Sequence, residues 1–198
     1  MPRIEEAHAT IAREDGVDWD AWYVLANDAR RSEIPPHAFG SGRRDTSWAI
    51  HRAHWLAGRY VHLYGLEPWE IVPAPTWADL EVELRRELEH LERHVAEGDN
   101  DPVEATYAIF NGSRILHAVE TGNVVISKRS AGAWSLEHLP GRWHAAIRAA
   151  GRAYDGKATA KDAALLRTAM APFVAMVRKR LPTLKEPSAE ALPRWSGS

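Results

Sequence analysis

The sequence predicts an all-α protein, a helical bundle of five to six helices that follows a short N-terminal strand-like remnant. Two observations carry this prediction. Capping residues, each followed by a run of helical length, recur at Thr76, Asp101, Ser127 and Thr159. In one of these runs apolar residues return every three or four positions, at Leu80, Leu84, Leu88, Leu91 and Val95. That spacing is typical of a helix with one face in a core.

Composition limits the class of protein. The chain has 198 residues, of which 45% are hydrophobic and 26% are charged, as in an ordinary globular protein. The net charge of −2 argues against broad nucleic-acid binding. There is no cysteine, so disulfides and thiolate metal sites are excluded, and a cytoplasmic location is expected. No apolar run approaches the roughly 20 residues of a membrane helix, so no membrane partner is expected.

Residues 1–44 are predicted to be an N-terminal remnant or linker. The segment from Val17 to Leu25 alternates apolar and acidic residues before it becomes apolar, as a strand does. Asp18 and Asp20 would lie on one side of that strand and are candidate catalytic carboxylates; the alternative is that both are solvated residues of a turn. Prolines and glycines between residues 30 and 44 predict a loop.

Residues 45–182 are predicted to form the helical domain. The first helix is expected over residues 45–64, ending at Gly65. A second helix begins at Thr76, with Asp79 placed for a capping box, and ends at Gly98. A third begins at Asp101, with Glu104 in the capping-box position, and ends at Gly122.

Three further helices complete the predicted bundle. They are expected from Ser127 to Pro140, over residues 141–154, and from Thr159 to about Leu181. A very short strand is expected over residues 123–126. Residues 183–198 are rich in proline and are expected to be a flexible tail.

One stretch resembles a known family. The run from Tyr107 to Leu116, Y-A-I-F-N-G-S-R-I-L, is similar to the core of the C-terminal domain of aminoglycoside adenylyltransferases, the nucleotidyltransferases that modify streptomycin and spectinomycin. The similarity continues through Glu120-Thr121-Gly122, Ser127-Lys128-Arg129, Ala131 to Trp134, Leu139-Pro140 and Ala153-Tyr154. With weaker similarity upstream, it covers roughly residues 45–180.

The resemblance implies a bacterial antibiotic-resistance protein of two halves. In the family, the first half carries Gly-Ser followed by Asp-x-Asp, which binds ATP and Mg²⁺. Here Gly40-Ser41 is not followed by Asp-x-Asp, and the segment from Val17 to Leu25 is similar to the last strand of that half. We therefore expect no AMP transfer and no cofactor for this chain on its own, with ATP and Mg²⁺ required only if a catalytic half is supplied.

The resemblance also implies a substrate side. The family's antibiotic pocket uses a tryptophan and acidic residues just before the third helix. Here that region holds Asp99, Asp101 and Glu104, followed by Tyr107, but no tryptophan. These residues are predicted to bind a small cationic, aminoglycoside-like ligand. The alternative is that Asp101 and Glu104 only cap the helix.

Other interpretations stay open at this point. The chain could be a non-catalytic homodimeric binding module, with a second copy covering an apolar face. It could also be a helical RNase or toxin-type module, suggested by the spacing of Arg44 and His51. His90 and His94 have the spacing of a metal pair, but no third ligand is evident and no metal site is predicted. Arg114 is expected to be structural, paired with Glu120 or Glu137.

Overall fold

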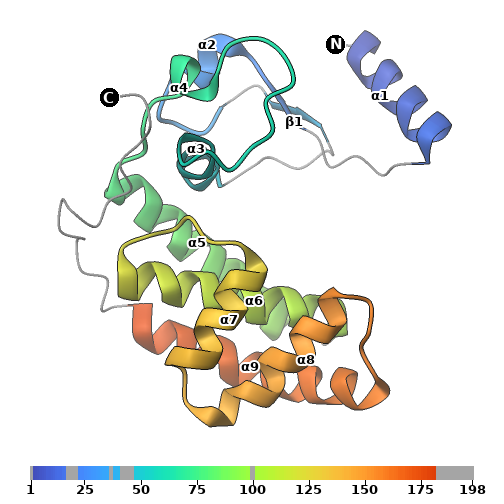
Figure 1. Ribbon diagram of the computed structural model, residues 1–198, viewed down its shortest axis with the longest axis vertical. Helices are drawn as coiled ribbons and strands as arrows, with labels where there is room; N and C mark the ends of the chain where they lie inside the picture. The colour runs from blue at the N-terminus through green and yellow to red at the C-terminus, as the bar shows by residue number, and fades with distance from the viewer. Residues whose placement is uncertain (1, 17–21, 36–37, 41–46, 99–100, 182–198) are drawn as a thin grey trace.

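The computed structural model describes residues 2–16, 22–35, 38–40, 47–98 and 101–181 (Figure 1). The described residues form nine α-helices, one short 3₁₀ helix and one pair of three-residue strands. The predicted all-α fold is therefore confirmed. No helix in these ranges is long and apolar enough to cross a membrane.

The N-terminal part contains α1 (Pro2–Asp15), β1 (Trp22–Val24), α2 (Ala26–Ala29) and β2 (Ala38–Gly40). β1 pairs antiparallel with β2, and Tyr23 lies opposite Phe39. The strand predicted within residues 17–25 is confirmed at its C-terminal end. Its partner β2 lies where the sequence predicted a loop. This strand could not be predicted, because three residues are too few to show the alternation of apolar and polar side chains.

The first predicted helix is shorter than expected. α3 (Trp48–Leu56) ends 8 residues before the predicted end at residue 64, and it is followed by a loop and the short α4 (Pro68–Ile71). Gly58 is the reason, because it adopts a φ of +72° and its N–H donates to the carbonyl of Trp55 over 2.9 Å. A glycine in this left-handed conformation ends a helix. The sequence pattern predicts this helix end at Gly65 instead.

As far as the structure describes it, the bundle consists of five α-helices and one short 3₁₀ helix. In chain order these are α5 (Trp77–Ala96), α6 (Pro102–Thr121), α7 (Lys128–His138), the 3₁₀ helix η1 (Gly141–Trp143), α8 (His144–Tyr154) and α9 (Ala160–Arg180). The predicted caps are confirmed: the side chains of Thr76, Asp101, Ser127 and Thr159 each accept a backbone N–H of the following helix. These side chains satisfy donors that have no partner inside a helix.

The strand predicted over residues 123–126 is wrong. This segment is an irregular connection whose polar groups are satisfied locally. The carbonyl of Asn123 bonds to Nδ1 of His117 over 2.9 Å, and the Asn123 side chain accepts from the N–H of Val125 over 2.8 Å. Val124 is buried against the bundle. A local turn of this kind removes the need for a partner strand.

α6 is the central helix and packs against α5, α7, α8 and α9 (Figure 1). Small residues let its neighbours approach. A Cβ at Gly132 of α7 would lie 2.8 Å from Phe110 of α6, and a Cβ at Gly112 would lie 3.0 Å from Phe173 of α9. The core therefore depends on glycine at helix contacts as well as on large apolar side chains.

A carboxylate from the bundle holds α3 in place. Glu83 of α5 accepts hydrogen bonds from the backbone N–H groups of Ala49 (2.7 Å) and Ile50 (2.8 Å) in the first turn of α3. Arg52, fully buried on the same helix, donates to the carbonyls of Pro73 (2.8 Å) and Ser32 (3.0 Å). Negative charge at a helix N-terminus is stabilising, so the bonds to Glu83 fix α3 beside α5.

Candidate functional site

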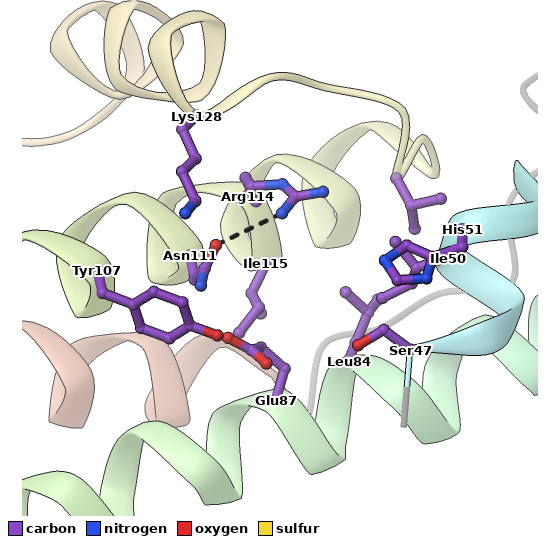
Figure 2. Close-up of a pocket in the computed structure, with 11 residues that line it drawn as sticks. Ser47, Ile50, His51, Leu84, Glu87, Tyr107, Asn111, Arg114, Ile115 and Lys128 are labelled. Carbon is purple, nitrogen blue, oxygen red and sulfur yellow. Dashed lines mark hydrogen bonds between the residues drawn. The ribbon is translucent and has the colours of Figure 1, made fainter. Parts of the chain in front are cut away.

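A charged pocket of about 330 Å³ lies between α3, α5, α6 and α7 (Figure 2). Its lining residues are Ser47, Ile50, His51, Leu84, Glu87, Tyr107, Asn111, Arg114, Ile115, Val124 and Lys128. We call it the charged pocket because two cationic side chains and one carboxylate line it among apolar residues. α3, which Glu83 holds beside α5, forms one of its walls through Ile50 and His51.

Arg114 lies on α6 and is largely buried. Its Nη2 is 3.1 Å from Nε2 of His54 on α3, and its Nη1 is 3.4 Å from Oδ1 of Asn111. Burial lowers the pKa of Arg114, while the negative charge of Glu87 acts in the opposite direction. Its Nε–H is buried and has no hydrogen-bond partner among the described residues. A buried guanidinium with an unused donor is suited to bind an anion.

Lys128 is the first residue of α7 and reaches the pocket from the opposite wall (Figure 2). Burial lowers its pKa, and the nearby charge of Arg114 lowers it further. Its Nζ lies 5.1 Å from the centre of the Tyr107 ring, which is within range of a cation–π contact. Two cations thus converge on one partly enclosed space.

Glu87 of α5 supplies the carboxylate of the pocket, and the hydroxyl of Tyr107 points toward it (Figure 2). Burial raises the pKa of Tyr107, and the charge of Glu87 adds to this shift. Oε1 of Glu87 is buried without a hydrogen-bond partner among the described residues. An unsatisfied buried carboxylate oxygen is costly, so this atom is a candidate contact for a ligand's N–H or O–H group.

A second, mainly apolar pocket of about 450 Å³ adjoins the first, because both are lined by Tyr107 and Lys128. It is otherwise lined by Pro102, Val103, Thr106, Phe110, Ala153, Tyr154, Gly156 and Ala158. The Phe110 and Tyr154 rings meet edge to face, with centroids 5.5 Å apart. We call these two adjoining pockets, both lined by residues of α6, the groove.

The helices that carry these pockets match a known family. The family model described as "Aminoglycoside adenylyltransferase, C-terminal domain" matches residues 78–180, slightly more than half of the chain. The chain belongs to this family. A search of curated proteins found no match. The matched region contains Glu87, Tyr107, Arg114 and Lys128, whereas α3 lies before it.

The family assignment confirms the resemblance drawn from the sequence. The predicted site residues, however, do not gather at one place among the described residues. Asp18, Asp20 and Asp99 lie outside the described residues. Asp101 is exposed and caps α6, its Oδ1 accepting from the N–H of Val103 over 2.7 Å. Oε2 of Glu104 is 3.2 Å from Nδ1 of His94. Among the predicted substrate-binding residues, Tyr107 lines both pockets.

The charged groups of this pocket, Arg114, Glu87 and Lys128, were not predicted as site residues from the sequence. Arg114 was assigned a structural role with Glu120 or Glu137, but Glu120 pairs with Arg180 over 2.9 Å and Arg114 faces the pocket. Lys128 was named only as part of the Ser127-Lys128-Arg129 motif, and Glu87 was not singled out. No sequence signal distinguishes these charges from exposed ones. They are enclosed only because α3 and α7 pack on α5 and α6.

A metal centre is not evident in the described part of the chain, which contains no group of three or more His, Asp or Glu side chains placed to hold an ion. The rings of His90 and His94 are in contact, with centroids 4.4 Å apart, and His90 also faces Tyr107. In the charged pocket, two cations accompany a single carboxylate. That charge balance does not fit Mg²⁺, which prefers several oxygen ligands.

Proposed function

We propose that the charged pocket is the ligand site of a substrate-side helical domain of the aminoglycoside adenylyltransferase type. In this proposal Arg114 and Lys128 bind phosphate groups of ATP, which replaces the expectation from the sequence that the chain takes no cofactor on its own. The observation that carries it is the convergence of these two partly buried cations, from α6 and α7, on one pocket. Charge-assisted hydrogen bonds to phosphate would compensate for the burial of both cations.

The cationic sugar-like ligand is proposed to lie on the acidic side of the same groove. Glu87 offers a buried oxygen that has no protein partner among the described residues. Asp101 and Glu104 lie at the N-terminal end of α6, within two turns before Tyr107 and next to Pro102 and Val103 of the second pocket. Carboxylates in this arrangement suit the ammonium and guanidinium groups of an aminoglycoside. ATP and this ligand would then meet near Tyr107, which borders both pockets.

We also propose that this chain does not transfer AMP on its own. Its sequence lacks a Gly-Ser turn followed by Asp-x-Asp, and the charged pocket does not suit a metal ion. ATP with Mg²⁺ would support transfer only with a catalytic half. Incubation with ATP, Mg²⁺ and streptomycin or spectinomycin should give no adenylylated antibiotic; product formed by the purified chain would contradict this proposal. A bacterial cytoplasmic role in antibiotic resistance stays a prediction from the family.

Isothermal titration calorimetry with ATP at low salt tests the phosphate assignment. We expect Arg114→Gln and Lys128→Gln to weaken ATP binding at least about tenfold. Arg86→Gln, which removes the same charge from an exposed position on α5, is the matched control and should bind as wild type does. Failure of wild type to bind ATP, or equal binding by all four proteins, would refute the assignment.

The same titration with streptomycin tests the acidic side of the groove. Glu87→Gln keeps the shape of the side chain and removes its charge, so binding of the cationic antibiotic should weaken several-fold. Glu89→Gln, at an exposed position of the same helix, is the control. If the two variants bind streptomycin equally well, Glu87 does not contact it.

A homodimeric binding module is the second candidate, and one observation favours it. The loop between α3 and α4 exposes Val61, Leu63 and Tyr64, each more than 80% accessible. Adjacent exposed apolar side chains are typical of an interface. Light scattering at increasing concentration should detect a dimer that a Leu63→Asp variant does not form; a wild-type monomer at high concentration would exclude this candidate. The RNase alternative stays untested, because Arg44 lies outside the described residues.

A further inference from the structure

His54 of α3 touches the guanidinium group of Arg114 from a different part of the chain. Nε2 of His54 and Nη2 of Arg114 are 3.1 Å apart, although 60 residues separate them in sequence. An arginine side chain has donors only. The contact is a hydrogen bond only when Nε2 of His54 carries a lone pair, which requires a neutral imidazole with its proton on Nδ1.

The surroundings of His54 favour this neutral form. Burial lowers the pKa of His54 to about 4, and the charges of Arg114, His51 and Arg59 contribute to the shift. A hydrogen bond to the backbone of Val124, in the connection after α6, opposes the shift and fits donation from the other ring nitrogen. Near neutral pH, His54 is therefore an acceptor with both nitrogens engaged.

The other contact of Arg114 is weaker. Its Nη1 is 3.4 Å from Oδ1 of Asn111, beyond the usual range of an N–H···O bond. Asn111 lies on the same helix as Arg114 and restrains it only locally. His54 lies on α3, which is itself fixed to α5 through Glu83. The orientation of the guanidinium is thus set across three helices by the bond to His54.

We propose that His54 is a positioning residue for the anion site, holding Arg114 as a neutral hydrogen-bond acceptor so that its Nε–H stays available to a phosphate group. This inference rests on the proposed function of the charged pocket. His54 does not itself line that pocket, so it acts through Arg114. The site would then depend on α3 as well as on the helices that carry its cations.

Two replacements separate this role from simple packing. His54→Gln keeps a polar atom near the position of Nε2 that can accept from Arg114, whereas His54→Leu fills similar space without an acceptor. With sodium tripolyphosphate as the probe at pH 7.5, calorimetry should show His54→Gln within about threefold of wild type. His54→Leu should bind at least about tenfold more weakly. His62→Leu, in the exposed loop after α3, should bind as wild type does.

Nitrogen-15 NMR of the wild-type protein gives a readout that needs no ligand. We expect His54 to show a protonated Nδ1 and an unprotonated Nε2 at pH 7.5. The Nη signals of Arg114 should be resolved in wild type and in His54→Gln, and averaged by free rotation in His54→Leu. A proton on Nε2, or unchanged tripolyphosphate affinity in a folded His54→Leu variant, would overturn the inference. Absence of wild-type binding would instead overturn the phosphate site, while the tautomer would still test the contact.

Discussion

Oε1 of Glu83 accepts a 2.7 Å hydrogen bond from the backbone N–H of Ala49, joining α5 to the first turn of α3. Oε2 of the same carboxylate accepts from the N–H of Ile50 over 2.8 Å. Glu83 is 6% exposed, so water does not replace these bonds easily. The position of α3, and with it one wall of the charged pocket, therefore depends in part on this carboxylate, alongside the contacts of Arg52 on the same helix.

Replacement of Glu83 by alanine should lower the free energy of unfolding by about 2–3 kcal/mol, because hydrogen bonds to a buried charged group are lost and two helix N–H groups remain unpaired. Chemical denaturation measures this change. The same replacement at Glu89, exposed on α5, should cost less than about 0.5 kcal/mol. Equal stability of the two variants would show that Glu83 does not hold α3.

Stability should fall in acid partly through His54. Its pKa is lowered to about 4 in the folded protein, against about 6.5 in an unfolded chain. The unfolded state therefore binds the proton more readily, and this contribution to stability, complete above about pH 6.5, is lost as the pH falls toward 4. Because the ring is only partly buried, we expect the loss to be roughly 1–2 kcal/mol.

Denaturation of wild type and His54→Gln between pH 7.5 and pH 4.5 isolates this contribution. Other groups titrate equally in both proteins, so the stability difference should change with pH only through His54. We expect wild type to lose more stability than the variant as the pH falls. Parallel curves over this range would mean that His54 has an ordinary pKa in the folded state.

Gly132 should not tolerate a methyl group. A Cβ there would lie 2.8 Å from Cε1 of Phe110, which is buried between α6 and α7. Gly132→Ala should cost about 1–3 kcal/mol by overpacking. Gly151→Ala is the matched control on α8, where a Cβ would meet no atom within 4 Å, and it should be neutral or stabilising by up to about 1 kcal/mol. Thermal unfolding that ranks the two variants in the opposite order would contradict this packing.

Tyr107 should matter for its ring more than for its hydroxyl in anion binding. Tyr107→Phe keeps the ring that faces Lys128 at 5.1 Å, so tripolyphosphate affinity should stay within about twofold of wild type. Tyr107→Leu removes the cation–π contact and should weaken binding about threefold. Calorimetry of both variants makes the comparison. Loss of binding in Tyr107→Phe would assign a direct role to the hydroxyl.

The helical part of the fold could be predicted because its signals are local. Thr76, Asp101, Ser127 and Thr159 mark helix starts through atoms within three residues. The end of α3 was missed because two glycines, Gly58 and Gly65, fit the pattern and both adopt positive φ.

The site was harder to predict because its residues are far apart in the sequence and meet only in the folded protein. Tyr107 and Arg114 lie in one motif, but the sequence does not show that Arg114 contacts His54, 60 residues away. Glu87 and Lys128 are separated in sequence by the whole of α6, and only the fold brings both to one pocket. The acidic ligand site expected from Asp99, Asp101 and Glu104 stays a prediction, because short motifs locate acidic residues but do not show which cations pack beside them.

The most direct test is to map where ATP binds by amide NMR, titrating ATP into the nitrogen-15-labelled protein at low salt. We predict saturable shifts centred on Asn111, Arg114 and Lys128, which are lost in Arg114→Gln. The exposed face of α9 should not respond. Saturable shifts elsewhere in the protein with none around the charged pocket, or no saturable shifts at all, would contradict the assignment of this pocket to phosphate binding.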